Sequence, residues 1–138
     1  MGYFNQYVRA ESLEEAYGLY QKKNNFVLGG MLWLKMRKRP FGTAIDLSDL
    51  GLDQIEEDEK EFRIGAYVSL RELETNEALN TYTKGAFAES VKHIVGVQFR
   101  NVATVGGSLW GRYGFSDVMT IFRAMGAKVQ LHHAGILD

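Results

Sequence analysis

The sequence predicts an α+β fold with two parts, a small parallel β-α-β subdomain at residues 1–55 and a mixed or antiparallel sheet with flanking helices at residues 56–138. Two short apolar runs, Phe26–Leu28 and Thr43–Leu47, are typical of buried parallel strands. Farther along the chain the pattern becomes that of an antiparallel hairpin followed by helices. No repeat, low-complexity tract or linker-like stretch separates the two parts.

The first part is predicted to contain one helix before its first strand and a second, brief helix between its two strands. Residues Ser12–Glu15 have the Ser-x-x-Glu spacing of a capping box, and apolar residues recur at helical spacing from Leu13 to Tyr20. After the first strand comes the pair Gly29-Gly30. Residues Met31–Arg37 then predict a brief helix with a basic end, closed by Pro40.

The second part is predicted to open with an antiparallel hairpin. Gln54–Glu56 and Glu61–Ala66 form its strands, and the acidic run Glu56–Glu61 forms its solvated tip. Ser69 and the glutamate three residues later repeat the capping box, which predicts a helix through Leu73.

The last third is predicted to alternate helices with irregular chain. Thr83–Val95 carries apolar residues at helical spacing, as a core-packed helix does, whereas Gln98–Ser108 breaks this pattern. Ser116 is a predicted N-cap for a helix through Ala124, and Lys128–Leu131 is predicted to be the final strand.

Composition excludes several classes of protein. Sixteen Lys and Arg against 17 Asp and Glu give a net charge of -1, so no strong field attracts nucleic acid or anionic lipid. No run reaches the ~18 apolar residues of a membrane span, and no signal peptide opens the chain. We therefore expect a soluble, cytoplasmic protein without nucleic-acid or membrane partners. The absence of cysteine excludes thiol catalysis and an iron–sulfur cluster held by this chain.

Glycine marks the candidate binding loops. The chain has 15 glycines and one proline, and two adjacent pairs, Gly29-Gly30 and Gly106-Gly107, lie at predicted turns. The Rossmann and P-loop phosphate patterns are absent. Without β-carbons, the two pairs could let backbone amides approach a diphosphate closely, and the first also opens a predicted helix. Ordinary tight turns are the alternative.

Two charged residues lie close to these glycines or to the next helix. Asp117 could accept hydrogen bonds from sugar hydroxyls, or it could simply interact with the helix dipole. Arg100 could face a phosphate or hold its loop through carbonyl groups. The sequence leaves both choices open.

Aromatic residues and histidines are predicted to be structural. Core packing is favoured over stacking on a planar ring for three aromatic residues, Trp33, Trp110 and Phe115. His93 has no carboxylate at helical spacing, and His132-His133 would point to opposite faces of a strand. No metal ligand and no catalytic side chain is predicted.

These segments together resemble the FAD-binding subunit or domain of the molybdopterin dehydrogenases, the group that includes xanthine dehydrogenase and carbon monoxide dehydrogenase. The strongest match is residues 98–109, QFRNVATVGGSL, which are similar to the family pattern IRN-x-A/G-T-I/V-GG-N/S-I/L. Further segments agree with the family in order and spacing: Phe26–Gly30, Asp46-Leu47, Ile64–Ala66 with Leu70, and Ser116-Asp117 followed by Ala124–Val129.

The resemblance implies that residues 1–55 and 56–138 are two FAD-binding subdomains, and that the glycine loops hold the FAD diphosphate, chiefly through backbone amides. It also implies that FAD relays electrons between a [2Fe–2S] small subunit and NAD⁺ or another acceptor, while a molybdopterin-containing large subunit oxidises the substrate. The implied cofactor-binding residues are Leu28, Gly29, Gly30, Met31, Leu32, Thr104, Gly106, Gly107, Ser108 and Asp117.

Two departures from the family keep alternatives open. The family's first loop usually reads Gly-Gly-Thr-Asp, whereas this one reads Gly-Gly-Met-Leu and lacks the hydroxyl, although main-chain amides could still serve. Family subunits are also longer, so we expect the second subdomain to be incomplete and the fold to be truncated before a C-terminal domain. One alternative is a non-catalytic scaffold or assembly module with weak or no flavin binding. The other is a different flavoenzyme, such as a sugar-nucleotide or alcohol oxidoreductase.

Overall fold

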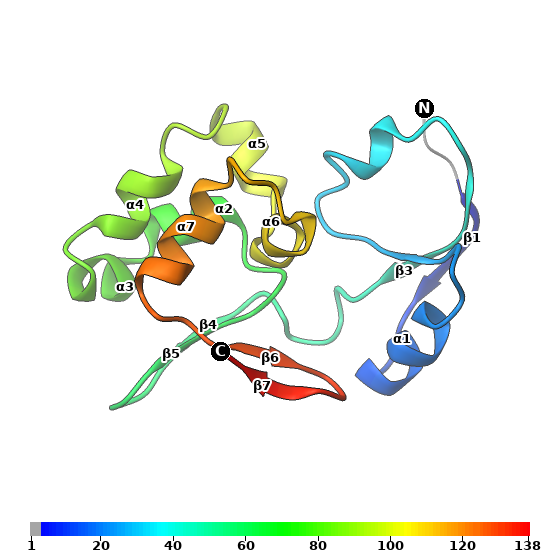
Figure 1. Ribbon diagram of the computed structural model, residues 1–138, viewed down its shortest axis with the longest axis horizontal. Helices are drawn as coiled ribbons and strands as arrows, with labels where there is room; N and C mark the ends of the chain where they lie inside the picture. The colour runs from blue at the N-terminus through cyan, green and yellow to red at the C-terminus, as the bar shows by residue number, and fades with distance from the viewer. Residues whose placement is uncertain (1–3) are drawn as a thin grey trace.

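The computed structural model describes residues 4–138, which form a β-α-β part and a mainly helical part, joined by the segment after β3 (Figure 1). The first part contains β1 (Phe4–Arg9), α1 (Leu13–Tyr20), β2 (Phe26–Val27), the 3-10 helix η1 (Leu34–Met36) and β3 (Phe41–Asp46). Its strands are all parallel in the order β1-β3-β2, so β3 is central and mostly buried. The predicted parallel unit is confirmed.

Helix α1 covers this small sheet. The Ser12 hydroxyl accepts a hydrogen bond from the Glu15 amide at 3.1 Å, as the predicted cap requires. Ala16 faces inward and packs in a cluster with Ala10 and Ile45. Strand β1 was not predicted, because its residues Phe4–Arg9 are mainly exposed and carry no continuous apolar run.

The second part consists of six short helices and two hairpins within the described range. The helices are α2 (Leu70–Thr75), α3 (Glu77–Tyr82), α4 (Ala86–Val91), α5 (Val97–Val102), α6 (Val105–Gly111) and α7 (Asp117–Ala124). Their buried residues form one core, which comprises Val68, Leu70, Leu73, Leu79, Phe87, Val91, Ala103, Val105, Val118 and Ile121. The capping box at Ser69 and Glu72 is confirmed.

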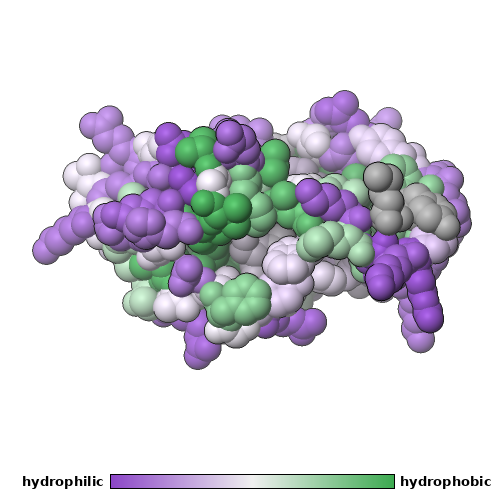
Figure 2. Space-filling model, turned by 90° about the horizontal axis from the view of Figure 1, so that it is seen from above, coloured by the Kyte–Doolittle hydropathy of each residue, from purple (hydrophilic) through white to green (hydrophobic). Residues whose placement is uncertain are grey.

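The antiparallel strands form two separate hairpins rather than one sheet. The first pairs β4 (Ile55–Glu57) with β5 (Phe62–Ile64), and Arg63 forms ion pairs with Asp58 and Glu61 at its acidic tip. The second pairs β6 (Val129–Leu131) with β7 (Gly135–Leu137). Seen from above, hydrophobic side chains gather toward the middle of the molecule, and hydrophilic ones project from both ends (Figure 2).

The structure corrects several predicted elements. Gln98–Ser108 is not irregular, because it contains most of α5 and the start of α6, with a break at Ala103-Thr104. The predicted helix Met31–Arg37 is reduced to the three-residue η1, and Thr83–Val95 is reduced to α4. Helix α3 and strand β7 were not predicted. None of the helices in the described residues is long and apolar enough to cross a membrane.

Candidate functional site

The two glycine loops meet at one place in the fold. The first loop, Leu28–Leu32, leaves the carboxyl end of β2, the edge of a parallel sheet where ligands commonly bind. A β-carbon on Gly30 would lie 1.9 Å from the carbonyl oxygen of Val102. The first loop therefore packs backbone to backbone against the segment that leads into α6. Figure 1 shows the chain between α1 and β3 coming near α6.

Thr104 lies between the two loops. A β-carbon on Gly29 would lie 2.9 Å from its Oγ1, and one on Gly107 would lie 3.0 Å from the same atom. Oγ1 accepts a hydrogen bond from the Gly107 amide at 3.1 Å and so caps α6. The hydroxyl proton has no protein acceptor within residues 4–138, so it can be donated to an oxygen atom of a ligand.

The first loop has free backbone donors. Among the described residues, the N–H groups of Gly29, Gly30, Met31 and Leu32 donate to no protein acceptor. The loop's flanks are held firmly, because the Leu28 amide donates to the Ile45 carbonyl at 2.8 Å and the Met31 carbonyl accepts from Lys35 at 2.9 Å. Met31 has a φ of 61°, which is uncommon for a non-glycine residue. Four consecutive free amides can hold an anion through the backbone alone.

The second loop is different, because its donors are already used. The Gly106 amide donates to the Ala66 carbonyl at 2.8 Å, and the Ser108 hydroxyl donates to the Thr104 carbonyl at 2.9 Å. A β-carbon on Gly106 would lie 2.8 Å from the Ala66 oxygen and 2.9 Å from the Ala66 Cβ. The absence of a side chain at Gly106 therefore lets α6 pack against residue 66.

The stretch of chain that contains the first loop is rich in basic residues, which the sequence reasoning missed. From residue 16 to residue 45 the chain contains no Asp or Glu and six basic residues, namely Lys22, Lys23, Lys35, Arg37, Lys38 and Arg39. The overall charge of -1 conceals this asymmetry. A count of charges in a sliding window would have found it.

Tyr67 was also missed as a residue that supports the loop. Its hydroxyl donates to the Leu28 carbonyl and accepts from the Leu47 amide at 3.1 Å, so it ties the ends of β2 and β3 to the chain before α2. Burial raises the pKa of this hydroxyl. No signal in a single sequence distinguishes this tyrosine from the six others.

Arg100 has a structural role, which settles one of the open choices. Its guanidinium Nε donates to Glu74 Oε2 at 2.8 Å and its Nη1 to the Ile94 carbonyl at 3.1 Å, and the residue is only 5% exposed. Burial raises the pKa of Glu74, but the hydrogen bonds and charges of Arg100 and Arg71 outweigh it and hold that pKa below its ordinary value. Arg100 is therefore unavailable to a phosphate.

Asp117 begins α7, behind its N-cap Ser116. Its exposed carboxylate makes no hydrogen bond or ion pair to any described residue, and no observed contact joins it to the glycine loops.

The aromatic residues are exposed, contrary to the predicted core positions. Trp33 is 55% exposed, Trp110 62% and Phe115 73%. The Trp33 ring lies 5.1 Å from that of Tyr113, which stacks on Phe115 at 5.3 Å. The segment directly after the first glycine loop therefore touches the connection between α6 and α7.

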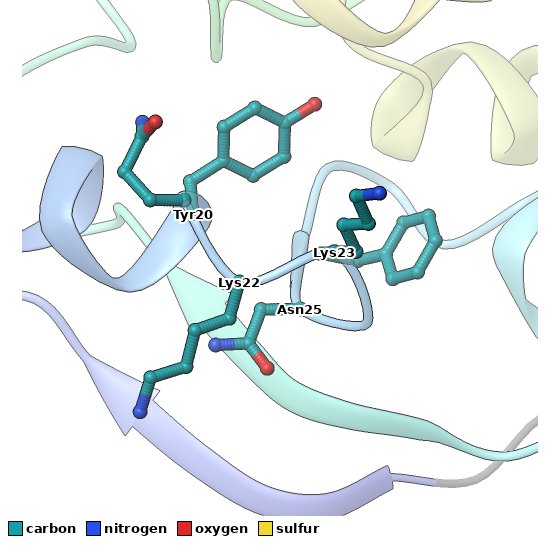
Figure 3. A pocket seen from close by; sticks show the side chains of 6 residues that line it. Tyr20, Lys22, Lys23 and Asn25 are labelled. Atoms are coloured by element: carbon teal, nitrogen blue, oxygen red, sulfur yellow. The ribbon is translucent and has the colours of Figure 1, made fainter.

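A shallow hollow of about 240 Å³ lies elsewhere, between the end of α1 and β2 (Figure 3). Asn25 at its edge is held within the protein, because its side chain donates to the Leu19 carbonyl at 2.8 Å and accepts from the Thr43 amide at 2.8 Å. The Lys22 side chain points away from those of Tyr20 and Lys23 (Figure 3). This hollow is part of the connection between the helix and the sheet.

The parallel sheet and the free amides of the first loop are typical of domains that bind an anionic group at the carboxyl end of a sheet. The sequence profile described as "FAD binding domain in molybdopterin dehydrogenase" matches residues 3–136. The chain belongs to this family, whose cofactor is FAD. The family predicted from the sequence is confirmed, and the different flavoenzyme is set aside.

The chain is also similar to one curated protein and to solved structures of CO dehydrogenases. The protein YgfM of Escherichia coli strain K12 is 29% identical over 131 residues, which cover 90% of this chain and 48% of YgfM. Reconstituted CO dehydrogenase from Oligotropha carboxidovorans has a TM-score of 0.83 at 24% identity, with 97% of this chain and 49% of that chain covered. The carbon monoxide dehydrogenase of Hydrogenophaga pseudoflava lacking the Mo-pyranopterin moiety has a TM-score of 0.64 at 27% identity, with 75% and 38% covered. The chain thus spans about half the length of the curated relatives it matches.

Proposed function

We propose that this chain holds the diphosphate of FAD on the amides of residues 29–32 and on the hydroxyl of Thr104. One observation carries the proposal: four consecutive amides have no protein acceptor within the described residues, in a stretch with six basic residues and no acidic one. Backbone donors do not depend on side-chain identity, so Met31 and Leu32 can serve where the family usually has Thr and Asp.

The remaining predicted residues would act indirectly or on another part of the cofactor. Leu28 fixes the start of the loop, and the groups of Gly106, Gly107 and Ser108 shape the start of α6, since their donors are used within the protein. Asp117 offers an exposed carboxylate to a sugar hydroxyl. We place the two binding subdomains at residues 1–55 and 56–138.

The proposed role is that of an electron-transfer module in a xanthine dehydrogenase-like molybdenum hydroxylase of the cytoplasm. FAD supplies the redox chemistry, and the chain supplies position and electrostatics. Because this sequence contains no cysteine, the [2Fe–2S] cluster that exchanges electrons with FAD would belong to a separate small subunit. Substrate oxidation would belong to a molybdopterin-containing large subunit, and NAD⁺ or another carrier would accept the electrons.

A comparison of three flavins tests the cofactor site. The purified chain is titrated with FAD, FMN and riboflavin while flavin fluorescence is recorded. If the free amides hold the diphosphate, FAD binds at one per chain, FMN at least tenfold more weakly, and riboflavin more weakly still. Higher salt weakens FAD binding, because the stretch that contains the loop carries six basic residues and no acidic one. Equal affinity for FAD and riboflavin would overturn the diphosphate assignment.

A scaffold or assembly module with weak flavin binding is the second candidate. Two observations favour it: Met31 replaces a hydroxyl residue, and the amides of Gly106 and Gly107 are not free. Capture of a molybdenum or iron–sulfur subunit by flavin-free chain would support the scaffold. Stoichiometric FAD in the titration would eliminate it.

A further inference from the structure

The turn of the β6–β7 hairpin places two histidines beside a glutamate of α1. His132 and His133 lie in the turn after β6 rather than within a strand, so their rings do not point to opposite faces as the sequence suggested. Nε2 of His132 lies 3.1 Å from Glu14 Oε2, and Nε2 of His133 lies 3.0 Å from the same oxygen. Figure 1 shows the end of this hairpin turned toward α1.

We propose that Glu14, His132 and His133 bind a divalent transition-metal ion, with zinc as the best match. One ligand atom from each residue lies within 4.8 Å of the others. In a tetrahedral site with bonds of about 2.0–2.1 Å, ligand atoms are about 3.3 Å apart. The two observed nitrogen–oxygen separations are within a few tenths of an ångström of that value, and the ligand nitrogens of the two histidines lie within 4.8 Å of each other. Rotation of the exposed histidine side chains can close the remaining distance.

The donor set suits this class of ion. Two imidazole nitrogens and one carboxylate oxygen are common zinc ligands, and hard ions such as Mg²⁺ and Ca²⁺ prefer oxygen alone. All three residues are exposed, so an ion can enter from solvent and water can complete the coordination.

Tyr17 holds the two rings in place before any metal binds. It lies one helical turn after Glu14, and its ring stacks on that of His133 with centroids 3.9 Å apart and planes at 13°. The His132 ring meets Tyr17 edge-on at 6.0 Å. Both imidazoles are thereby directed toward the glutamate, which lowers the entropy lost when an ion binds.

Such a site would connect distant parts of the chain. Glu14 and His132 are 118 residues apart, and β6 and β7 are exposed along their whole length. A bound ion would therefore fasten the last hairpin to the β-α-β part and stabilise the folded state.

The experiment uses the full chain without a histidine tag. Zinc binding is measured by calorimetry, and cobalt is added to detect the visible absorption of four-coordinate Co²⁺. We expect one zinc per chain, a cobalt band that zinc abolishes, and a rise in melting temperature with zinc. His133→Ala and Glu14→Gln each weaken binding at least tenfold, since loss of one of three ligands removes much of the affinity.

His93→Ala is the matched control, because His93 is exposed and lies outside the cluster. It leaves zinc affinity unchanged. Circular dichroism confirms that each variant is folded, and the three substituted positions are all on the surface. Equal zinc affinity in wild type and in the double variant Glu14→Gln/His133→Ala would overturn the proposal, as would absence of zinc binding by wild type. Zinc binding is measured without flavin, so failure of the zinc proposal can be told apart from failure of the FAD proposal.

Discussion

Gly30 touches the backbone of Val102. A β-carbon on Gly30 would lie 1.9 Å from the Val102 carbonyl oxygen and 2.6 Å from its carbonyl carbon, which is closer than any side chain can approach. The chain before α6 is thus built directly onto the loop that carries the free amides. The spacing between those amides and Thr104 depends on the missing side chain at Gly30.

Substitution Gly30→Ala should separate the two loops. We expect FAD affinity to fall at least tenfold, because the amides move away from Thr104, and the free energy of unfolding to fall by about 1–3 kcal/mol from overpacking. FAD titration and urea denaturation measure the two effects.

Gly18→Ala is the control for the same chemical change. Gly18 lies within α1, and a β-carbon there meets nothing within 4 Å. Alanine favours a helix over glycine by about 1 kcal/mol, so this variant should be slightly more stable and bind FAD as wild type does. Unchanged FAD affinity in Gly30→Ala would contradict the proposed contact between the loops and the cofactor.

Thr104→Ala should affect both stability and FAD binding. The variant loses the cap of α6, which costs about 1 kcal/mol, and loses the hydroxyl proton available to a phosphate oxygen. We expect about tenfold weaker FAD binding, as loss of one hydrogen bond to a charged group implies. Thr104→Ser keeps the hydroxyl, so it should retain most of the stability and most of the FAD affinity of wild type. If Thr104→Ala lowers stability alone, Thr104 is only a helix cap.

The parallel unit and its glycine loop could be predicted from the sequence because local signals agree there. Phe26–Leu28 is an apolar run stopped by two glycines, and Ser12 caps the helix before it. At the start of α6 the local sequence argued against the helix that forms there, since Gly106 and Gly107 are poor helix formers. Tertiary contacts with Ala66 and the Thr104 cap hold them in a helix, and neither contact is visible in the sequence.

The candidate site was predictable as a pair of loops but not in its details. Sequence alone does not reveal that the Gly29–Leu32 amides are free while the Gly106 amide is bonded, because backbone pairing depends on the fold. The exposure of Trp33 and the burial of Arg100 likewise depend on neighbours distant in the chain. From residue type alone, Trp33 was predicted to pack in the core, and the role of Arg100 was left open.

Glu74→Gln tests the ion-pair partner of the buried Arg100. Arg100 is 5% exposed, so removal of the carboxylate leaves a buried guanidinium without its counter-charge, at a cost of about 2–4 kcal/mol. Glu89→Gln removes the partner of Lys92 on the surface and should have little effect. Chemical denaturation of the two variants makes the comparison. Equal small losses would show that the Arg100 pair contributes no more than a surface pair.

The same pair should make stability depend on pH in the acid range. The pKa of Glu74 is raised by burial but lowered further by Arg100 and Arg71, so it lies below the value of about 4.3 expected in the unfolded chain. The unfolded state therefore binds the proton more tightly, and the stabilisation from Glu74 is complete above about pH 4.3 and declines as the pH falls toward the lower folded pKa.

We therefore expect the stability difference between wild type and Glu74→Gln to be greatest near neutral pH and to shrink below about pH 4. Asp46 also has a lowered pKa, because hydrogen bonds from Ser48 and Tyr7 outweigh its burial, but it is present in both proteins and cancels in the difference. Denaturation curves recorded at intervals from neutral to acid pH give this difference directly. A difference that stays constant through the acid range would mean that the carboxylate of Glu74 titrates alike in the folded and unfolded chains.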